Sequence, residues 1–184
     1  MAMNVLVAAG STEPTPVLDA ARGALEAGHH TVTMLDLAAE GFGQFMSADE
    51  RRAYHDADNL VTPETRASAT LLRSHDALLV CTSLVQGAID PLAKSWFERV
   101  FIPEVSFTFT PSGRVTGALT NIKRVGMIVS CPDGTAEAKP RLASTRSVLR
   151  GVRMNASKRC RTTYLPIGPS EDIDDRVTAA LARW

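Results

Sequence analysis

Three hydroxyl side chains follow the first apolar run of the sequence, within the stretch Gly10-Ser-Thr-Glu-Pro-Thr15. A helix-like pattern begins directly after it, so Ser11 and Thr15 are expected beside a helix N-terminus. Free backbone N–H groups and the helix dipole at such a position favour a phosphate. The alternative is that these hydroxyls are only helix caps. Neither G-x-G-x-x-G nor G-x-x-x-x-G-K-[ST] is present, which argues against a Rossmann-type dinucleotide site and a P-loop NTPase.

Two further loops are expected to face a ligand. They are Ser83-Leu-Val-Gln-Gly-Ala-Ile-Asp90 and Ser130-Cys-Pro-Asp-Gly134, and each follows an apolar run. Short loops of this kind can present backbone N–H and carbonyl groups to a flat heterocycle. The pattern is common among α/β proteins, so it indicates a place for a ligand without identifying the ligand.

The residue types needed for proton transfer or nucleophilic attack are scattered. The candidates are His29, His30, His55, His75, Cys81, Cys131 and Ser83. No cysteine has a histidine close by in the sequence, and the serine lacks a G-x-S-x-G turn. The cysteines also lack zinc spacing, so no metal site is expected. A ligand-binding chain without reactive groups of its own fits an enzyme whose bound cofactor supplies the chemistry.

Composition places this chemistry in a globular protein. The 184 residues are 45% hydrophobic and 22% charged, and 20 Lys and Arg balance 20 Asp and Glu. A protein whose main task is to bind a nucleic-acid backbone usually has a basic excess, so nucleic acid is not an expected partner. No apolar run is long enough to cross a bilayer, and the first ten residues lack the features of a signal peptide. With an odd number of cysteines, a reducing cytoplasm is the expected location.

Strand-like and helix-like apolar patterns alternate along the chain. The predicted strands are residues 4–9, 31–37, 76–82, 122–131 and 162–167. The predicted helices are residues 16–28, 64–74, 91–101, 138–152 and 172–184, with a short helix opened by a capping box at Ser47–Glu50. Pro166 is expected to weaken the last strand.

This alternation predicts a parallel sheet with helices on both faces. We expect one α/β domain over residues 1–184, a flavodoxin-like three-layer sandwich with a five-stranded parallel sheet in the order 2-1-3-4-5. In such sheets the ligand lies beyond the carboxyl ends of the strands, near the switch point between strands 1 and 3. The three loops described above all fall at that edge.

Three segments in the same order resemble the flavodoxin-like NAD(P)H:quinone oxidoreductases, a family that includes proteins similar to the modulator of drug activity B. The first is Lys94-Ser-Trp-Phe-Glu-Arg-Val-Phe-Ile-Pro-Glu-Val-Ser-Phe-Thr-Phe109, which is similar to the family pattern LKGW[FI][ED]RVF and its aromatic pair. The second, residues 35–54, is similar to DLYAEGF…LSxEER…Y. The third is residues 112–131. The similarity runs in order over nearly the whole chain.

The resemblance implies an enzyme that passes a hydride from NAD(P)H through a bound flavin to a quinone or related aromatic acceptor. It implies FAD, with FMN as an alternative, and a homodimer without membrane insertion. Phosphate or ribityl contacts fall on Ser11 and Thr15, and Val17 holds the position of a family amide. The isoalloxazine loop falls on Ser83, Leu84, Val85 and Gln86, and the loop at its polar edge on Ser130, Cys131, Pro132, Asp133 and Gly134. Phe107 and Phe109 correspond to aromatics placed over the partner's site, with a buried hairpin core as the alternative.

Three departures from the family leave other functions open. Residues 83–87 lack the usual proline and aromatic residues, the first loop lacks the family histidine, and Pro132 removes a potential N–H donor. One alternative is therefore a flavodoxin-like regulatory or binding module with a weakened or lost flavin site. Another is a repurposed biosynthetic enzyme that acts on a larger aromatic substrate. The sequence does not distinguish NADH from NADPH.

Overall fold

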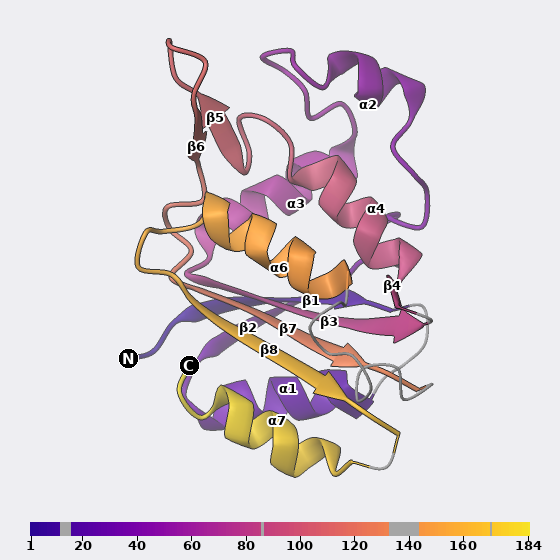
Figure 1. The fold of residues 1–184 in the computed structure, drawn as a ribbon, viewed down its shortest axis with the longest axis vertical. Helices are drawn as coiled ribbons and strands as arrows, with labels where there is room; N and C mark the ends of the chain where they lie inside the picture. The colour runs from indigo at the N-terminus through magenta and orange to yellow at the C-terminus, as the bar shows by residue number, and fades with distance from the viewer. Residues whose placement is uncertain (12–15, 86, 133–143, 170) are drawn as a thin grey trace.

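Five parallel strands form the main sheet of the computed structural model, which describes residues 1–11, 16–85, 87–132, 144–169 and 171–184. In chain order they are β1 (Asn4–Gly10), β2 (Thr31–Asp36), β3 (Ala77–Val85), β7 (Arg124–Ser130) and β8 (Arg161–Ile167). They lie side by side in the order β2-β1-β3-β7-β8 (Figure 1). The predicted strand order is confirmed, with β7 and β8 as its fourth and fifth strands.

Helices cover both faces of this sheet and complete three layers (Figure 1). One face carries α1 (Pro16–Ala27) and α7 (Ile173–Leu181), and the other carries α3 (Pro63–Ser74), α4 (Pro91–Val100) and α6 (Ser144–Asn155). Alternate side chains of β1 supply the two layers: Val5 and Val7 pack with the α1/α7 cluster, and Leu6 and Ala8 with the opposite cluster. All four are fully buried, which explains why this strand is a continuous apolar run. None of the described helices has the length and apolar character needed to cross a membrane.

Four shorter elements lie around this framework. They are α2 (Ala48–Ala53), β4 (Ala88–Ile89), β5 (Phe107–Phe109) and β6 (Val115–Gly117). The capping box predicted for α2 is confirmed, because the backbone N–H of Ser47 donates to Glu50 Oε2 at 2.7 Å and the N–H of Glu50 donates to Ser47 Oγ at 3.1 Å. β5 and β6 form a separate antiparallel hairpin that projects beyond α3 and α6 (Figure 1).

Several element boundaries differ from the sequence prediction, among them those of β3 and α6. β3 continues to Val85, beyond the predicted end at residue 82, because Leu84 and Val85 pair with Ile89 and Ala88 of β4. α6 spans Ser144–Asn155, whereas residues 138–152 were predicted to be helical. Residues 138–143 of that prediction lie outside the described residues.

Pro166 lies within β8, at the edge of the sheet, and does not prevent the strand from forming. Its register partner is Val129 of β7, and β8 pairs with β7 from Arg161 to Ile167. An edge strand tolerates proline because one side of its backbone has no neighbouring strand to bond. The carbonyl of Pro166 accepts a hydrogen bond from Arg176 Nη2 at 3.4 Å. The predicted weakening of this strand is therefore not seen in its pairing.

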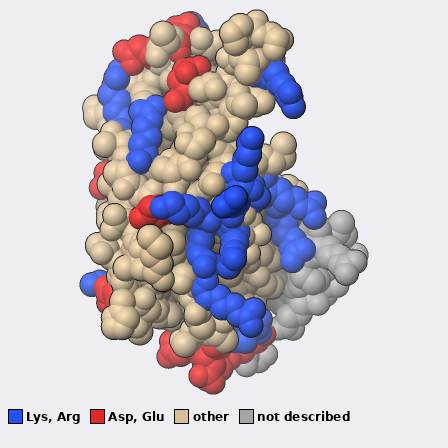
Figure 2. Space-filling view, turned by 90° about the vertical axis from the view of Figure 1, so that its left-hand side faces the viewer, with Lys and Arg blue, Asp and Glu red and all other residues tan. Residues whose placement is uncertain are grey.

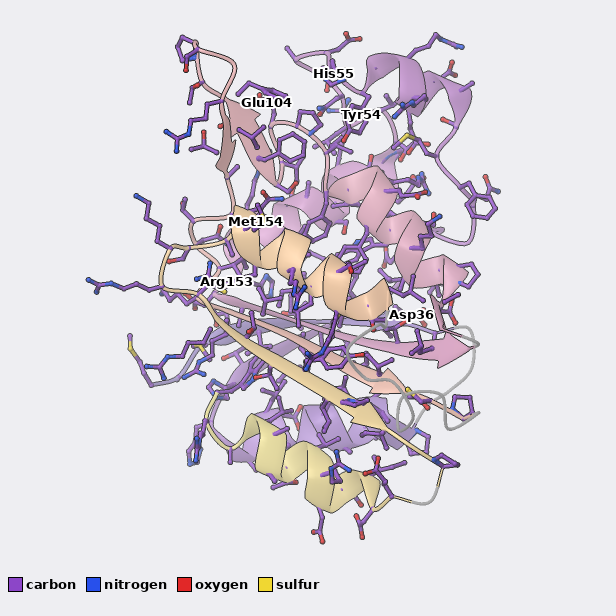
Figure 3. The ribbon with its side chains drawn as sticks, in the orientation of Figure 1. Asp36, Tyr54, His55, Glu104, Arg153 and Met154 are labelled. Atoms are coloured by element: carbon purple, nitrogen blue, oxygen red, sulfur yellow. The ribbon has the colours of Figure 1, made fainter. Side chains whose placement is uncertain are left out.

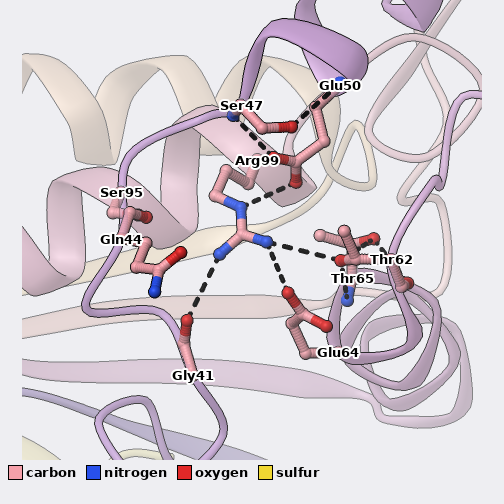
Figure 4. Close-up of polar contacts among 9 residues, drawn as sticks. All are labelled: Gly41, Gln44, Ser47, Glu50, Thr62, Glu64, Thr65, Ser95 and Arg99. Atoms are coloured by element: carbon pink, nitrogen blue, oxygen red, sulfur yellow. Dashed lines mark hydrogen bonds and ion pairs between the residues drawn. The ribbon is translucent and has the colours of Figure 1, made fainter.

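A buried arginine joins α4 to the segment between β2 and α3 (Figure 4). The Arg99 side chain is 4% exposed; its Nε donates to Glu50 Oε1 at 2.7 Å and its Nη2 to Glu64 Oε1 at 2.6 Å. The same guanidinium donates to the carbonyl of Gly41 and the hydroxyl of Thr62. The charge of Arg99 is thus compensated by two carboxylates, and Gly41 and Thr62 accept two of its other three N–H groups.

This pairing sets the ionisation of both carboxyl groups. Burial raises the pKa of Glu50, but hydrogen bonds from Ser47 and Arg99 outweigh burial and leave it below the ordinary 4.5. Burial likewise raises the pKa of Glu64, and a backbone N–H together with Arg99 brings it below its ordinary value. A carboxyl group whose pKa is lowered on folding stabilises the protein above its unfolded pKa. It loses that contribution as the pH falls through the folded pKa.

We predict that Arg99→Met lowers the free energy of unfolding by about 3 kcal/mol at pH 7, because two carboxylates lose their buried partner. Urea unfolding monitored by circular dichroism measures the change. The matched control is Arg66→Met, which removes an exposed ion pair with Asp58 and should cost less than about 1 kcal/mol.

The pH profile distinguishes charge from packing. Below about pH 4.5 the unpaired carboxyl groups of the variant can be protonated, and the wild type loses its ion pairs, so the difference between the two proteins should shrink. A difference that stays constant down to pH 3.5 would assign the loss to packing alone.

Candidate functional site

The carboxyl ends of the parallel strands meet at one edge of the sheet, where the arrowheads of β3, β7 and β8 point in Figure 1. Strand register places Gly10 of β1 beside Thr82 of β3, and Ser83 of β3 beside Ser130 of β7. The hydroxyl residues at the start of two predicted ligand loops are therefore neighbours on adjacent strands. This is the edge at which the topology predicts a ligand.

The connection from β3 to α4 is held by its own polar groups. Ser83 Oγ donates to Asp90 Oδ2 at 2.9 Å, and the N–H of Asp90 donates to the carbonyl of Ser83 at 3.1 Å. The other carboxylate oxygen of Asp90 accepts from the N–H of Leu92 at 2.9 Å and caps α4. Gly87 closes the β3–β4 turn at a φ of 81°, in the left-handed region that glycine favours.

Leu84, in the same connection, has a side chain that is 1% exposed and belongs to the core. At Leu84 a ligand would therefore meet main-chain atoms, because the side chain is buried. The backbone of Val85 continues β3, and Gln86 lies outside the described residues.

The end of β7 offers fewer donors than its sequence indicates. The side chain of Cys131 is fully buried, and its N–H donates to the carbonyl of Ile167 at 2.8 Å. Pro132 is exposed and has no N–H, while Ser130 is half-buried beside Ser83. Asp133 and Gly134 lie outside the described residues. The structure describes three predicted residues of this loop: Ser130, Cys131 and Pro132. Among these three, Ser130 is the residue that places a polar side-chain group at the carboxyl edge.

The first predicted loop is described at its two ends. Ser11 is half-buried directly after β1, and Val17 is buried in the first turn of α1; Thr15 lies outside the described residues. Gly10 is required by close packing, since a Cβ there would lie 2.8 Å from Ala93 Cβ on α4. The Gly10 carbonyl also accepts from Thr82 Oγ1 at 2.8 Å. β1, β3 and α4 are thereby fixed to one another at the base of the edge.

Several polar residues that the sequence analysis did not single out shape this edge. Asp36 lies at the end of β2 (Figure 3), where its Oδ1 accepts from the N–H groups of Ala38 and Ala39 at 3.0 and 3.1 Å. Asp90 and Thr82 are the others. The pair Asp90-Pro91 could have identified the cap of α4 from the sequence, because aspartate before proline is a common helix start.

The buried His30, His75 and Cys81 have structural surroundings. His30 Nδ1 accepts from the N–H of Met3 at 3.2 Å, and His75 bonds to Leu71 and Thr33, away from the carboxyl edge. Burial raises the pKa of the Cys81 thiol to about 12, so it does not form a thiolate near pH 7. No group of three or more metal-ligating side chains occurs among the described residues.

Phe107 and Phe109 lie on the β5–β6 hairpin, with their ring centroids 5.7 Å apart. Phe109 is 48% exposed, and its ring lies 6.4 Å from that of His55, which is labelled next to Tyr54 in Figure 3. The alternative interpretation of the pair as a buried hairpin core is therefore wrong for Phe109. The hairpin lies at the opposite end of the helical layer from the carboxyl edge (Figure 1), so within one chain these rings do not reach the predicted site.

The fold is that of an α/β protein of the flavodoxin-like type. Residues 3–184 match a family described by its flavodoxin-like fold, and the chain belongs to that family.

Solved structures agree with this fold. An NAD(P)H:quinone oxidoreductase from Methanothermobacter marburgensis is 20% identical, with a TM-score of 0.75 over 100% of this chain and 99% of that one. An azoreductase from Bacillus anthracis is 15% identical, with a TM-score of 0.71 over 97% and 95% of the two chains. An FMN-dependent NADH-azoreductase from the same species, in complex with FMN, is 12% identical with a TM-score of 0.69 over 97% and 94%. No curated protein matches the sequence.

We predict that Gly10→Ala destabilises the protein by about 1–3 kcal/mol, because neither Ala93 nor the backbone around it can move without strain. Restoring the space with Ala93→Gly in the same chain should recover part of the loss, although glycine itself weakens α4 by about 1 kcal/mol. Thermal unfolding of the two single variants and the double variant measures the coupling. Strictly additive effects would show that this contact does not set the position of α4.

Proposed function

We propose that this chain is a flavin-dependent NAD(P)H oxidoreductase that reduces a quinone or a related aromatic acceptor. The observation that carries the proposal is the carboxyl edge of the sheet, where Ser83 and Ser130 lie side by side and β4 pairs with the end of β3 directly after Ser83. The names of structurally similar proteins support the same class of reaction.

The donor set of this edge fits a planar ring with a phosphate tail. The described residues place hydroxyl and main-chain groups there, and the carboxylate of Asp90 is directed to α4 and Ser83. Ser11, at the approach to α1, would hold the phosphate, because a helix N-terminus favours an anion. The backbone from Ser83 to Gly87 and the Ser130 hydroxyl would hold the ring.

A flavin held at the carboxyl ends of the strands would supply the redox chemistry, which is hydride transfer from NAD(P)H and two-electron reduction of the acceptor. The residues around the carboxyl edge would orient the flavin, NAD(P)H and the acceptor, and would keep other groups from reacting with them. The buried Cys81 and Cys131 thiols are kept away from the reacting molecules. The three cysteines form no disulfide, which supports a reducing compartment.

We propose FMN in place of the FAD that the sequence resemblance implies. One structurally similar azoreductase is described as FMN-dependent and contains FMN. FAD is tested beside FMN in each flavin-binding experiment.

The test is flavin binding followed by anaerobic reduction. We expect the purified protein to bind FMN with one site per chain, to bleach on addition of NADH or NADPH, and to regain its visible absorbance when a benzoquinone is added. Ser11→Glu should weaken FMN binding at least about tenfold, because its carboxylate repels the phosphate. The control Ser147→Glu adds the same charge at an exposed position of α6 and should bind FMN normally.

Failure to bind either FMN or FAD would overturn the proposal. It would favour a flavodoxin-like binding module, to which one observation already points: the Cys131 N–H is used within the sheet, and Pro132 has none. Co-purification of a partner, without turnover of NAD(P)H, would support that second function.

We also propose a homodimer in which the β5–β6 hairpin contacts the second copy. Phe109 and Val115 on this hairpin are 48% and 55% exposed, an arrangement that favours association. Light scattering of the wild type should give a dimer at micromolar concentration, and Phe109→Ser should weaken it at least tenfold. Phe45→Ser, at another exposed phenylalanine, is the matched control. A monomeric wild type would contradict this proposal, because Phe109 could then not lie over the candidate site of a second copy.

A further inference from the structure

A pocket of about 300 Å³ opens at the amino edge of the sheet, opposite the candidate flavin site. Segment 1–3 forms one side of it, and the other lining residues are Asp76, Lys123, Arg124, Arg159, Arg161 and Trp184. Viewed from this side, Lys and Arg gather over the middle of the molecule (Figure 2). A protein with zero net charge has therefore concentrated positive charge around one concave surface.

Two of these arginines repel each other. Arg124 of β7 and Arg161 of β8 are register partners, so their side chains leave the same face of neighbouring strands. In the described part of the chain neither guanidinium has a carboxylate partner or a hydrogen bond. Burial lowers the pKa of Arg124, and the charge of Arg161 lowers it further. Like charges directly opposite in a sheet are destabilising, so this pair costs stability when the pocket holds no anion.

The acidic residue of the pocket does not remove this excess charge. Asp76 Oδ1 accepts from Lys123 Nζ at 2.8 Å, and its other oxygen accepts from the N–H of Asn4 at 3.1 Å. Asp76 therefore compensates Lys123. The charges of Arg124, Arg159 and Arg161 remain uncompensated by any described carboxylate.

The basic residues are held in place by the turn after α6. Arg153, at the end of that helix (Figure 3), donates to the carbonyls of Ser157 and Lys158 at 3.4 and 2.9 Å. The N–H of Ser157 donates to the carbonyl of Ile122, and that of Arg161 to the carbonyl of Lys123. These bonds fix the backbone that carries Arg159, so the position of its Cα is set before any ligand binds, while its side chain is exposed.

Trp184 gives the pocket a rigid wall. Its Nε1 donates to Thr163 Oγ1 at 2.9 Å, and its ring packs on Gly126, where a Cβ would lie 2.5 Å from Trp184 Cζ2. A concave, basic site of about 300 Å³ suits a compact anion better than a long polymer. Arginine guanidinium groups bind phosphate oxygens through paired hydrogen bonds.

We propose that this pocket is a second ligand site, which binds a small anion carrying at least two phosphate groups. Such an anion would bring Arg124 and Arg161 to a shared counter-charge and relieve their repulsion. Free diphosphate and the phosphate chain of a nucleotide share this chemistry, so both are tested.

The experiment measures binding and stability together. Isothermal titration with diphosphate, and separately with ATP without added metal, should each show one site per chain. Millimolar diphosphate should raise the unfolding temperature by about 3 °C or more beyond sodium chloride of equal ionic strength. Arg161→Gln should weaken binding at least tenfold. Arg114→Gln, which removes an exposed charge from the β5–β6 hairpin, should bind as the wild type does.

A second readout separates this site from a nonspecific charge effect. Without anion and at low salt, Arg161→Gln should unfold at a higher temperature than the wild type, because the like-charge pair is gone, whereas Arg114→Gln should not. Tighter binding of ATP than of diphosphate would identify a nucleotide as the ligand, and equal binding would identify the diphosphate group itself.

Three results would overturn the proposal: no binding beyond the salt control, equal losses in Arg161→Gln and Arg114→Gln, or preference for a single-stranded oligonucleotide over both small anions. Saturating FMN is added during the titrations so that the carboxyl edge is occupied and the titrated anion binds elsewhere. If the flavin proposal fails, the dependence on Arg161 is unaffected, so the two proposals can fail separately.

Discussion

Burial of one parallel sheet on both faces is the constraint on which the rest of this structure depends. Val5, Leu6, Val7 and Ala8 of β1 have no exposed surface, because one helical layer or the other covers each of them. The faces therefore cannot hold a polar ligand. Polar ligands are therefore expected at the ends of the strands. Because the strands are parallel, their carboxyl ends lie together on one side of the sheet and their amino ends on the opposite side. The hydroxyl-rich and arginine-rich surfaces follow from this division.

Helix α4 connects the distant parts of the molecule to the carboxyl edge. Asp90 caps its start and bonds to Ser83, Ala93 packs against Gly10, and Arg99 near its end holds Glu50 and Glu64. Buried ion pairs often add little net stability, because desolvation offsets their attraction. Here the guanidinium meets two carboxylates, so its main effect is to fix where the segment between β2 and α3 lies against the helix.

The strand order could be predicted from the sequence because it follows from patterns along the chain, and it is confirmed. The position of the ligand follows from the same topology and stays a prediction. Continuous apolar runs mark strands buried on both faces, and their alternation with helices dictates a parallel order. Features that depend on register or on distant partners were not predictable. Nothing in the sequence pairs Arg124 with Arg161, or shows that the Cys131 N–H is used by Ile167. The partners of Arg99 come from two segments 35 and 49 residues away, so their meeting also required the fold.

Pro166 affects whether the edge strand β8 can pair with a strand of another molecule. An exposed strand edge can recruit another chain and start a growing fibre. At this position the backbone has no N–H to donate, and Arg176 already occupies the carbonyl. A strand from a neighbouring molecule would meet a gap in its hydrogen-bond ladder near the end of β8. Pro166 therefore disfavours polymerisation of this protein through the unpaired side of β8 in concentrated solution.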